Sequence, residues 1–214
     1  MIKYALGGGT DQLEHLLNYA NGVQVKLSKE RGRGIFAEKD IKKGELIIVE
    51  KPIAVVEKMV LSDEKLGSKE LKKLCNDRIT ELTEKCLALY KLKGIEALRL
   101  SYLCDGENIN ESIPPDNLYV SSAYKKYKLK KLSERTIANI VVKNNFGGSV
   151  PSPSDENAIH SNALLLGLVS FMNHSKHPNV SYKCAGLHLH LVYADKDIQK
   201  GDELCIDYVR GVDD

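Results

Sequence analysis

The sequence has 214 residues, of which 43% are hydrophobic and 28% are charged. This apolar content is sufficient for one folded domain, or for one domain that carries an insert. The formal net charge is only +2, so no overall field favours nucleic acid or an anionic membrane as a partner. No apolar run reaches the ~20 residues of a membrane-spanning helix, and no charged-then-apolar signal pattern is expected at the N-terminus.

The five cysteines are odd in number and widely spaced, and no Cys-x-x-Cys pair occurs. A zinc finger is therefore not expected, and no metal site is predicted. Unpaired thiols are typical of a reducing compartment, which indicates the cytosol or the nucleus.

Residues 1–22 open with a glycine run, residues 7–9, that is followed by Thr10. A phosphate-binding loop would need a preceding strand and a Gly-Lys-Ser/Thr ending, and neither is present. The better interpretation is a short helix that Thr10 caps. One face of this helix would carry the leucines Leu13, Leu16 and Leu17.

The next segment, residues 23–61, has the pattern of short strands. Residues 23–27 alternate between apolar and polar side chains, which predicts a strand. Residues 31–34 (RGRG) form a predicted turn, whose two glycines let the backbone approach a ligand. Strands are predicted again at residues 35–37 and 46–49.

The chain contains a quasi-repeat, since residues 37–45 (AEKDIKKGE) are echoed by residues 194–202 (ADKDIQKGD). Each copy leads out of one strand and into another. Two copies at this separation cannot stack as an array, so they are interpreted as two similar strand-turn-strand units.

Residues 62–142 change to a helical pattern and are predicted to form an insert. Apolar side chains recur at spacings of three and four between residues 71 and 89. A second predicted helix carries Ala123, Tyr124 and Tyr127. A third is capped by Ser133 and buries residues 137–141. Residues 147–157 are rich in Ser, Pro and Gly, which predicts a loop.

An apolar run at residues 163–169 ends close to Asn173, His174 and Ser175. Polar groups bunched at the mouth of a buried segment are typical of a binding site. An ordinary helix end with capping residues is the alternative.

The last part of the chain returns to strands. Residues 180–184 and 187–193 form a predicted hairpin, in which His188 and His190 lie on one face. Two histidines could bind a metal, but no third ligand is evident, so an exposed strand face is expected. Residues 204–207 alternate in polarity and place Tyr208 at the end of a final strand.

Three motifs occur in order: residues 31–37, residues 173–175 with Pro178 and Asn179, and residues 201–208 (GDELCIDY). Together they resemble the SET-domain protein lysine methyltransferases. The sequence Asn144-Asn145-Phe146 and the helical insert look most like the SMYD-type subgroup.

The resemblance implies an α+β architecture, a mostly β SET fold of short strands with a pseudoknot, interrupted by the helical insert. The first SET half would be residues 23–61 and the second residues 143–214. Residues 62–142 would be the insert and residues 1–22 an N-terminal helical segment.

The resemblance also implies methyl transfer from S-adenosyl-L-methionine to a lysine of a histone or another protein, in the nucleus or cytoplasm. A lysine ammonium must first lose its proton, and an apolar channel lowers the pKa of that group. Tyr208 matches the family's catalytic tyrosine, which would orient the neutral amine. The residues that match its cofactor-binding positions are Arg31, Gly32, Arg33, Asn144, Ser170, Asn173, His174 and Tyr208.

Two features depart from the family pattern, and several alternatives stay open. Lys176 stands where many members have a zinc-binding cysteine, and the insert lacks a cysteine-rich MYND zinc finger. Tyr208 alone would otherwise be a packing residue at a rim, and Arg33 a solvated turn residue. A catalytically idle, cofactor-binding scaffold is the rival function. The basic run at residues 125–131 is read as a solvated helix face or as a nucleic-acid contact.

Overall fold

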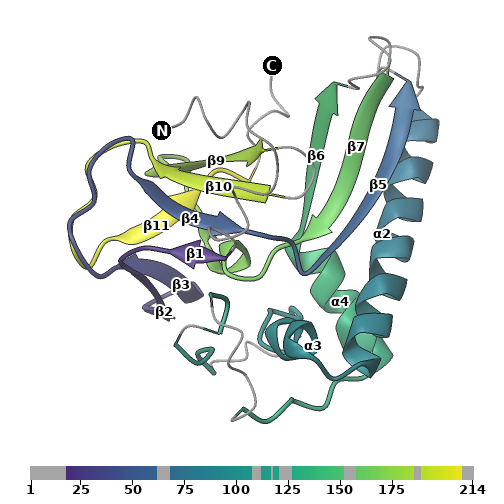
Figure 1. Ribbon diagram of the computed structural model, residues 1–214, viewed down its shortest axis with the longest axis horizontal. Coiled ribbons are helices and arrows are strands. Elements are labelled where there is room, and N and C mark those ends of the chain that lie inside the picture. The colour runs from purple at the N-terminus through teal and green to yellow at the C-terminus, as the bar shows by residue number, and fades with distance from the viewer. Residues whose placement is uncertain are drawn as a thin grey trace.

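The computed structural model describes residues 18–61, 68–107, 112–116, 118–120, 127–151, 158–185 and 189–208. These residues form three sheets and a set of helices (Figure 1). The helix predicted after Thr10 lies outside the described residues. None of the described helices is long and apolar enough to cross a bilayer.

The first sheet has four antiparallel strands in the order β1-β4-β10-β9. Their bounds are Tyr19–Ala20, Leu46–Glu50, Leu189–Ala194 and Val180–Ala185. The sequence predicts strands at residues 46–49 and 180–184, and both are confirmed, as β4 and β9. The predicted hairpin is confirmed as the pair β9–β10.

The second sheet has the order β2-β3-β11-β8, and only its β11–β8 pair is parallel. The bounds are Val23–Ser28, Gly32–Ala37, Glu203–Ile206 and Asn173–His174. The predicted turn at residues 31–34 is largely wrong, because β3 already begins at Gly32. The chain reverses at residues 29–31, and Gly32 takes a positive φ of 71° as it enters the strand.

The third sheet has the order β5-β7-β6, with bounds Ala54–Leu61, Ala158–Leu165 and Asn145–Pro151. It stands beside helix α2, which contacts β5 and β7 (Figure 1). The loop predicted at residues 147–157 is wrong up to Pro151, because pairing with β7 overrides the glycines and proline. Pro151 is tolerated because β6 is an edge strand. Residues 152–157 lie outside the described residues.

The apolar run at residues 163–169 belongs to this sheet and not to a helix. It completes β7 and then passes into the 3-10 turn η4, Val169–Phe171. The helix-end alternative is therefore wrong. Strand β7 and the turn η4 therefore lead directly into β8, which consists of Asn173 and His174.

The insert contains α2 (Ser68–Lys91), α3 (Ile95–Leu100) and α4 (Glu134–Asn144). The spacing of apolar residues predicted α2 and α4. The Ser133 cap is present, with its Oγ accepting from the Thr136 amide at 3.0 Å. In the second predicted helix, Ala123 and Tyr124 lie outside the described residues, and Tyr127 lies in a bend.

The quasi-repeat forms one paired structure. Ile41 and Ile198 exchange two backbone hydrogen bonds of 2.9 Å each. The Lys200 amide donates to Asp40 Oδ1, and in the other copy the Lys43 amide donates to Asp197 Oδ1, both at 2.9 Å. Each unit therefore supplies the same groups to the other.

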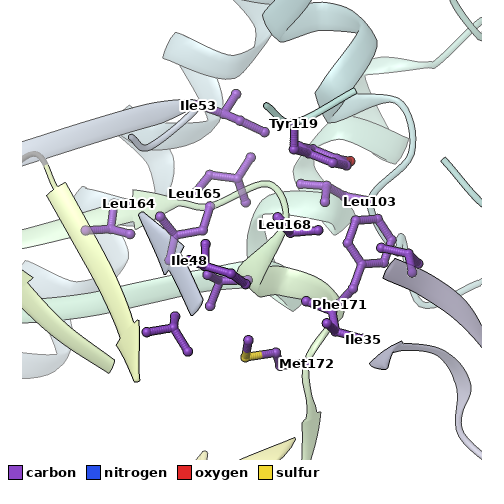
Figure 2. Close-up of a cluster of buried hydrophobic side chains, with 14 of the residues drawn as sticks. Ile35, Ile48, Ile53, Leu103, Tyr119, Leu164, Leu165, Leu168, Phe171 and Met172 are labelled. Atoms are coloured by element: carbon purple, nitrogen blue, oxygen red, sulfur yellow. The ribbon is translucent and has the colours of Figure 1, made fainter. Parts of the chain in front are cut away.

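One hydrophobic core joins the sheets to the insert, and Figure 2 shows part of it. It includes residues from β3, β4, β7 and the segment before β8. The labelled members are Ile35, Ile48, Ile53, Leu103, Tyr119, Leu164, Leu165, Leu168, Phe171 and Met172.

The prediction of an exposed histidine face on β10 is wrong. His190 is only 1% exposed, and its Nδ1 lies 3.7 Å from Cys184 Sγ. Val192 and Ala194 share this buried face. Burial lowers the pKa of His190 to about 4, so the ring is neutral at pH 7.

Candidate active site

The candidate active site forms where β8 lies parallel to β11. The register pairs Cys205 with Asn173 and Ile206 with His174. Asn179 also stabilises the position of β11. Its Oδ1 accepts from the Cys205 amide at 2.8 Å, and its Nδ2 donates to the Glu203 carbonyl at 2.9 Å. Strand β11 therefore lies against the Asn-His segment.

This register places Tyr208 beside His174. The Tyr208 amide donates to His174 Nδ1 at 3.1 Å, and the two ring centroids are 5.4 Å apart. Because a backbone amide can only donate, Nδ1 must accept, and the neutral ring carries its proton on Nε2. Asp207 Oδ1 also lies 3.6 Å from Nδ1.

Glu203 connects the first motif to the second. Its carboxylate pairs with the Arg31 guanidinium and accepts from Asn173 Nδ2 at 2.6 Å. Arg31 Nη1 also donates to the His174 carbonyl at 3.0 Å. A Cβ on Gly34 would lie 2.3 Å from Glu203 Oε1, so glycine leaves the space that this carboxylate occupies.

Arg33 contributes its backbone and its side chain to different parts of the structure. Its carbonyl accepts from Asn173 Nδ2 at 3.1 Å. Its buried guanidinium donates to the carbonyls of Tyr102 and Ser112 and lies 4.8 Å from the centroid of the Phe171 ring. Burial lowers the pKa of the guanidinium. The solvated-turn alternative for Arg33 is therefore wrong.

A pocket of about 330 Å³ lies next to this network. Three residues of the predicted site line it: Asn144, Ser170 and Tyr208. Asn144 is buried, and its Nδ2 donates to the carbonyls of Cys104 and Ile140 at 2.6 and 2.7 Å. The aromatic rings of Phe146 and Tyr182 also line the pocket, 6.0 Å apart and edge to face.

The Tyr208 side chain connects the pocket to the Asn-His segment. Its hydroxyl donates to the Met172 carbonyl at 2.6 Å, although 61% of the residue remains exposed. The buried part of the side chain raises the pKa of the phenol, so it is protonated at neutral pH.

The predicted residues thus fall into two adjoining groups that meet at Tyr208. One group surrounds Glu203, and the other lines the pocket. The first contains Arg31, Arg33, Asn173 and His174, and the second Asn144, Ser170 and Tyr208. Gly32 lies between Arg31 and Arg33 at the start of β3. Among the described residues, no cluster of three or more His, Cys, Asp or Glu side chains could hold a metal ion.

Glu203 and Asn179 are parts of the site to which the sequence motifs assigned no role. Both residues lie inside the quoted motifs. Their hydrogen-bond partners could not be predicted, because each partner comes from a segment distant in the sequence. The one signal in the sequence was that Glu203 is an acidic residue at the start of a predicted strand whose other side chains are apolar or Cys.

A SET domain family model matches residues 32–209 of the sequence. The chain therefore belongs to the SET domain family, whose members are generally protein lysine methyltransferases. The mostly β SET fold is confirmed by this match and by the three sheets.

A similar solved structure is a Plasmodium falciparum protein described as a "putative histone methyltransferase". The sequences are 16% identical, and the match covers 89% of this chain and 95% of that chain with a TM-score of 0.37. A search of curated proteins finds no match.

Proposed function

We propose that this SET domain is an S-adenosyl-L-methionine-dependent protein-lysine N-methyltransferase of the SMYD type. One observation carries the proposal. Tyr208 lines a pocket with Asn144 and Ser170, its amide donates to His174 Nδ1, and its hydroxyl donates to the carbonyl of Met172, the residue before Asn173. The residues that match the family's cofactor and catalytic positions therefore form one continuous site.

The residues around the pocket fit the cofactor. The volume of about 330 Å³ is within the range of small-molecule sites, roughly 300–1,000 Å³. Asn144 and Ser170 supply polar groups, and the Arg31–Asn173 network supplies a guanidinium and an amide for a zwitterionic amino-acid end. When bound, the cofactor would supply an activated methyl group on its sulfonium.

Tyr208 would orient the lysine amine. Its O–H is committed to the Met172 carbonyl, so the hydroxyl oxygen is left to accept an N–H of a neutral amine. That hydrogen bond fixes the direction of the amine's lone pair. A narrow apolar channel around that hydroxyl would disfavour the charged ammonium and so lower the pKa of the lysine.

The exposure of Tyr208 favours a second candidate function. With 61% of this residue exposed, the described residues do not enclose a narrow apolar channel around the hydroxyl. A SET module that binds the cofactor without turnover would have such an open site. A protein substrate could instead supply the missing wall, since a closed site is what excludes water.

The proposed substrate is a protein that carries a lysine, in the nucleus or the cytoplasm.

The basic run at residues 125–131 remains a proposed nucleic-acid contact, and residues 125 and 126 lie outside the described residues. Lys130 is not a freely solvated residue, since its Nζ donates to Ser112 Oγ at 2.9 Å and lies 3.9 Å from the Tyr102 ring centroid. A DNA affinity that falls steeply with salt would support this contact.

Labelled cofactor and a mixed protein extract provide the decisive experiment. Incorporation of the methyl label into lysine side chains would support the proposed activity. Binding of S-adenosylhomocysteine without incorporation would favour the idle module. If the chain binds neither S-adenosylmethionine nor S-adenosylhomocysteine at millimolar concentration, both functions are excluded.

A further inference from the structure

Glu50, at the end of β4, is a buried carboxylate that the proposed site does not contain. It is 3% exposed. Its Oε1 accepts from the amides of Gly167 and Leu168 at 2.8 and 2.6 Å, and its Oε2 accepts from the Val169 amide at 3.0 Å. Three consecutive amides therefore converge on one carboxylate. A buried charge is retained only where such hydrogen bonds compensate for lost hydration.

The segment that Glu50 holds leads directly into the candidate active site. It connects β7 to β8 and carries Ser170, whose Oγ donates to the Leu166 carbonyl at 2.7 Å. Asn173 and His174 follow within four residues of Ser170. The backbone path through residues 167–169 therefore determines where these three side chains begin.

The helical insert also contacts this segment, through Tyr119. A Cβ on Gly167 would lie 2.4 Å from Tyr119 Cδ1 and 2.8 Å from Glu50 Oε1. The aromatic ring and the carboxylate thus both lie against Gly167 and leave no room for a side chain. Tyr119 also contacts Phe171 edge to face, with centroids 5.7 Å apart (Figure 2).

Tyr119 is itself fixed by the insert. Its hydroxyl donates to the Arg99 carbonyl at 3.0 Å, and Arg99 Nε donates to the Leu118 carbonyl at 3.0 Å. The buried Arg99 guanidinium also favours the ionised form of Glu50, which burial disfavours by raising the pKa of that carboxyl. The insert therefore contacts the 167–169 segment through Tyr119 and acts on Glu50 through the charge of Arg99.

We propose that Glu50 is a positioning residue, which sets the backbone of residues 167–171 and thereby the cofactor-facing geometry of Ser170, Asn173 and His174. This inference rests on the proposed function of the site. Glu50 touches neither the pocket residues nor Tyr208 in the described structure, so its effect is transmitted through the main chain.

The test compares Glu50→Gln with the matched control Glu45→Gln. In Glu50→Gln an amide NH₂ replaces one acceptor oxygen, so at least one of the three amides loses its partner. Glu45 is a second carboxylate of limited exposure, and it pairs with Lys39 at 2.8 Å, outside the Glu50–Tyr119–Arg99 network. Three properties are measured for each protein: the unfolding midpoint, hydrogen exchange at amides 167–169, and the Kd for S-adenosylhomocysteine by calorimetry.

We expect Glu50→Gln to exchange faster at amides 167–169 and to bind S-adenosylhomocysteine about tenfold more weakly, the effect of one charge-assisted hydrogen bond on an equilibrium constant. Glu45→Gln should lower the midpoint without changing the Kd. If Glu50→Gln does not fold, the same three properties are measured for Glu50→Asp. It keeps the carboxylate one methylene away from the amides and should show a smaller loss in Kd.

The outcomes separate the two proposals. A parent protein that does not bind S-adenosylhomocysteine overturns the proposed function and this inference together. A parent that binds, with a folded Glu50 variant of unchanged Kd, overturns only the inference. A Kd that weakens equally in Glu45→Gln would show a general loss of stability, and would also overturn it.

Discussion

The phenolic oxygen of Tyr208 gives the sharpest test of the proposed chemistry. In Tyr208→Phe the ring remains, and only the hydroxyl that donates to the Met172 carbonyl at 2.6 Å is removed. The substitution therefore separates packing from positioning. We expect the folded structure and cofactor binding to be retained while turnover is largely lost.

The magnitudes follow from where this hydroxyl lies. One hydrogen bond contributes about 0.5–1.5 kcal/mol to stability, and the 61% exposure of Tyr208 puts its bond at the lower end of that range. Removing one positioned polar group at a reacting centre costs on the order of 10² to 10³ in rate. The rate effect should thus far exceed the effect on the free energy of unfolding.

The assay is single-turnover methylation of a lysine substrate at saturating cofactor, combined with calorimetric titration of S-adenosylhomocysteine. Tyr182→Phe is the matched control, because it removes another phenolic hydroxyl from the same pocket. We expect the control to retain turnover within a few-fold of the parent. Full activity in Tyr208→Phe would refute the reasoning and leave Tyr208 as a packing residue.

Three other predictions concern the network, the buried histidine and the open site. Glu203→Gln should weaken S-adenosylhomocysteine binding about tenfold, because the substituted amide no longer neutralises Arg31; calorimetry would measure this, and an unchanged Kd would count against the network. Lowering the pH from 6.5 to 4 should reduce the free energy of unfolding by about 3 kcal/mol through His190. The pKa of this ring is near 6.5 in the unfolded chain and about 4 in the folded protein, so the unfolded state binds the proton first. In denaturant titrations, His190→Asn should flatten this pH dependence, and a slope equal to that of the parent would contradict the argument. A lysine in a short peptide should be methylated more slowly than the same lysine in its parent protein, and equal, rapid steady-state rates would show that the channel is already complete.

The spacing of apolar side chains predicted those helices and strands in which this spacing matches the buried face. The alternation at residues 23–27 and the three-and-four spacing of α2 both located their elements. The same reasoning failed at residues 147–151, where the glycines and proline indicate a loop. There, hydrogen bonds to β7 compensate for the poor strand propensity.

Burial was harder to predict than secondary structure. The period of two placed His190 on one face of its strand, but it does not tell which face meets the core. Cys184 and Val192 lie on the buried side, and the imidazole is neutral beside them. The hydrogen-bonded role of Glu203 could not be predicted for a related reason, since its partners Arg31 and Asn173 come from distant segments.

The mutual pairing of the two repeat copies has a consequence for how the chain folds. It has the form of an isologous dimer interface enclosed within one polypeptide, since each copy offers the same backbone groups to the other. Asp40 and Lys200 are 160 positions apart, so the earlier turn finds its partner only when nearly all of the chain is available. Contacts of such high sequence separation are costly to close and form late. Folding of the two SET halves should therefore be concerted, with neither half stable until the second copy meets the first.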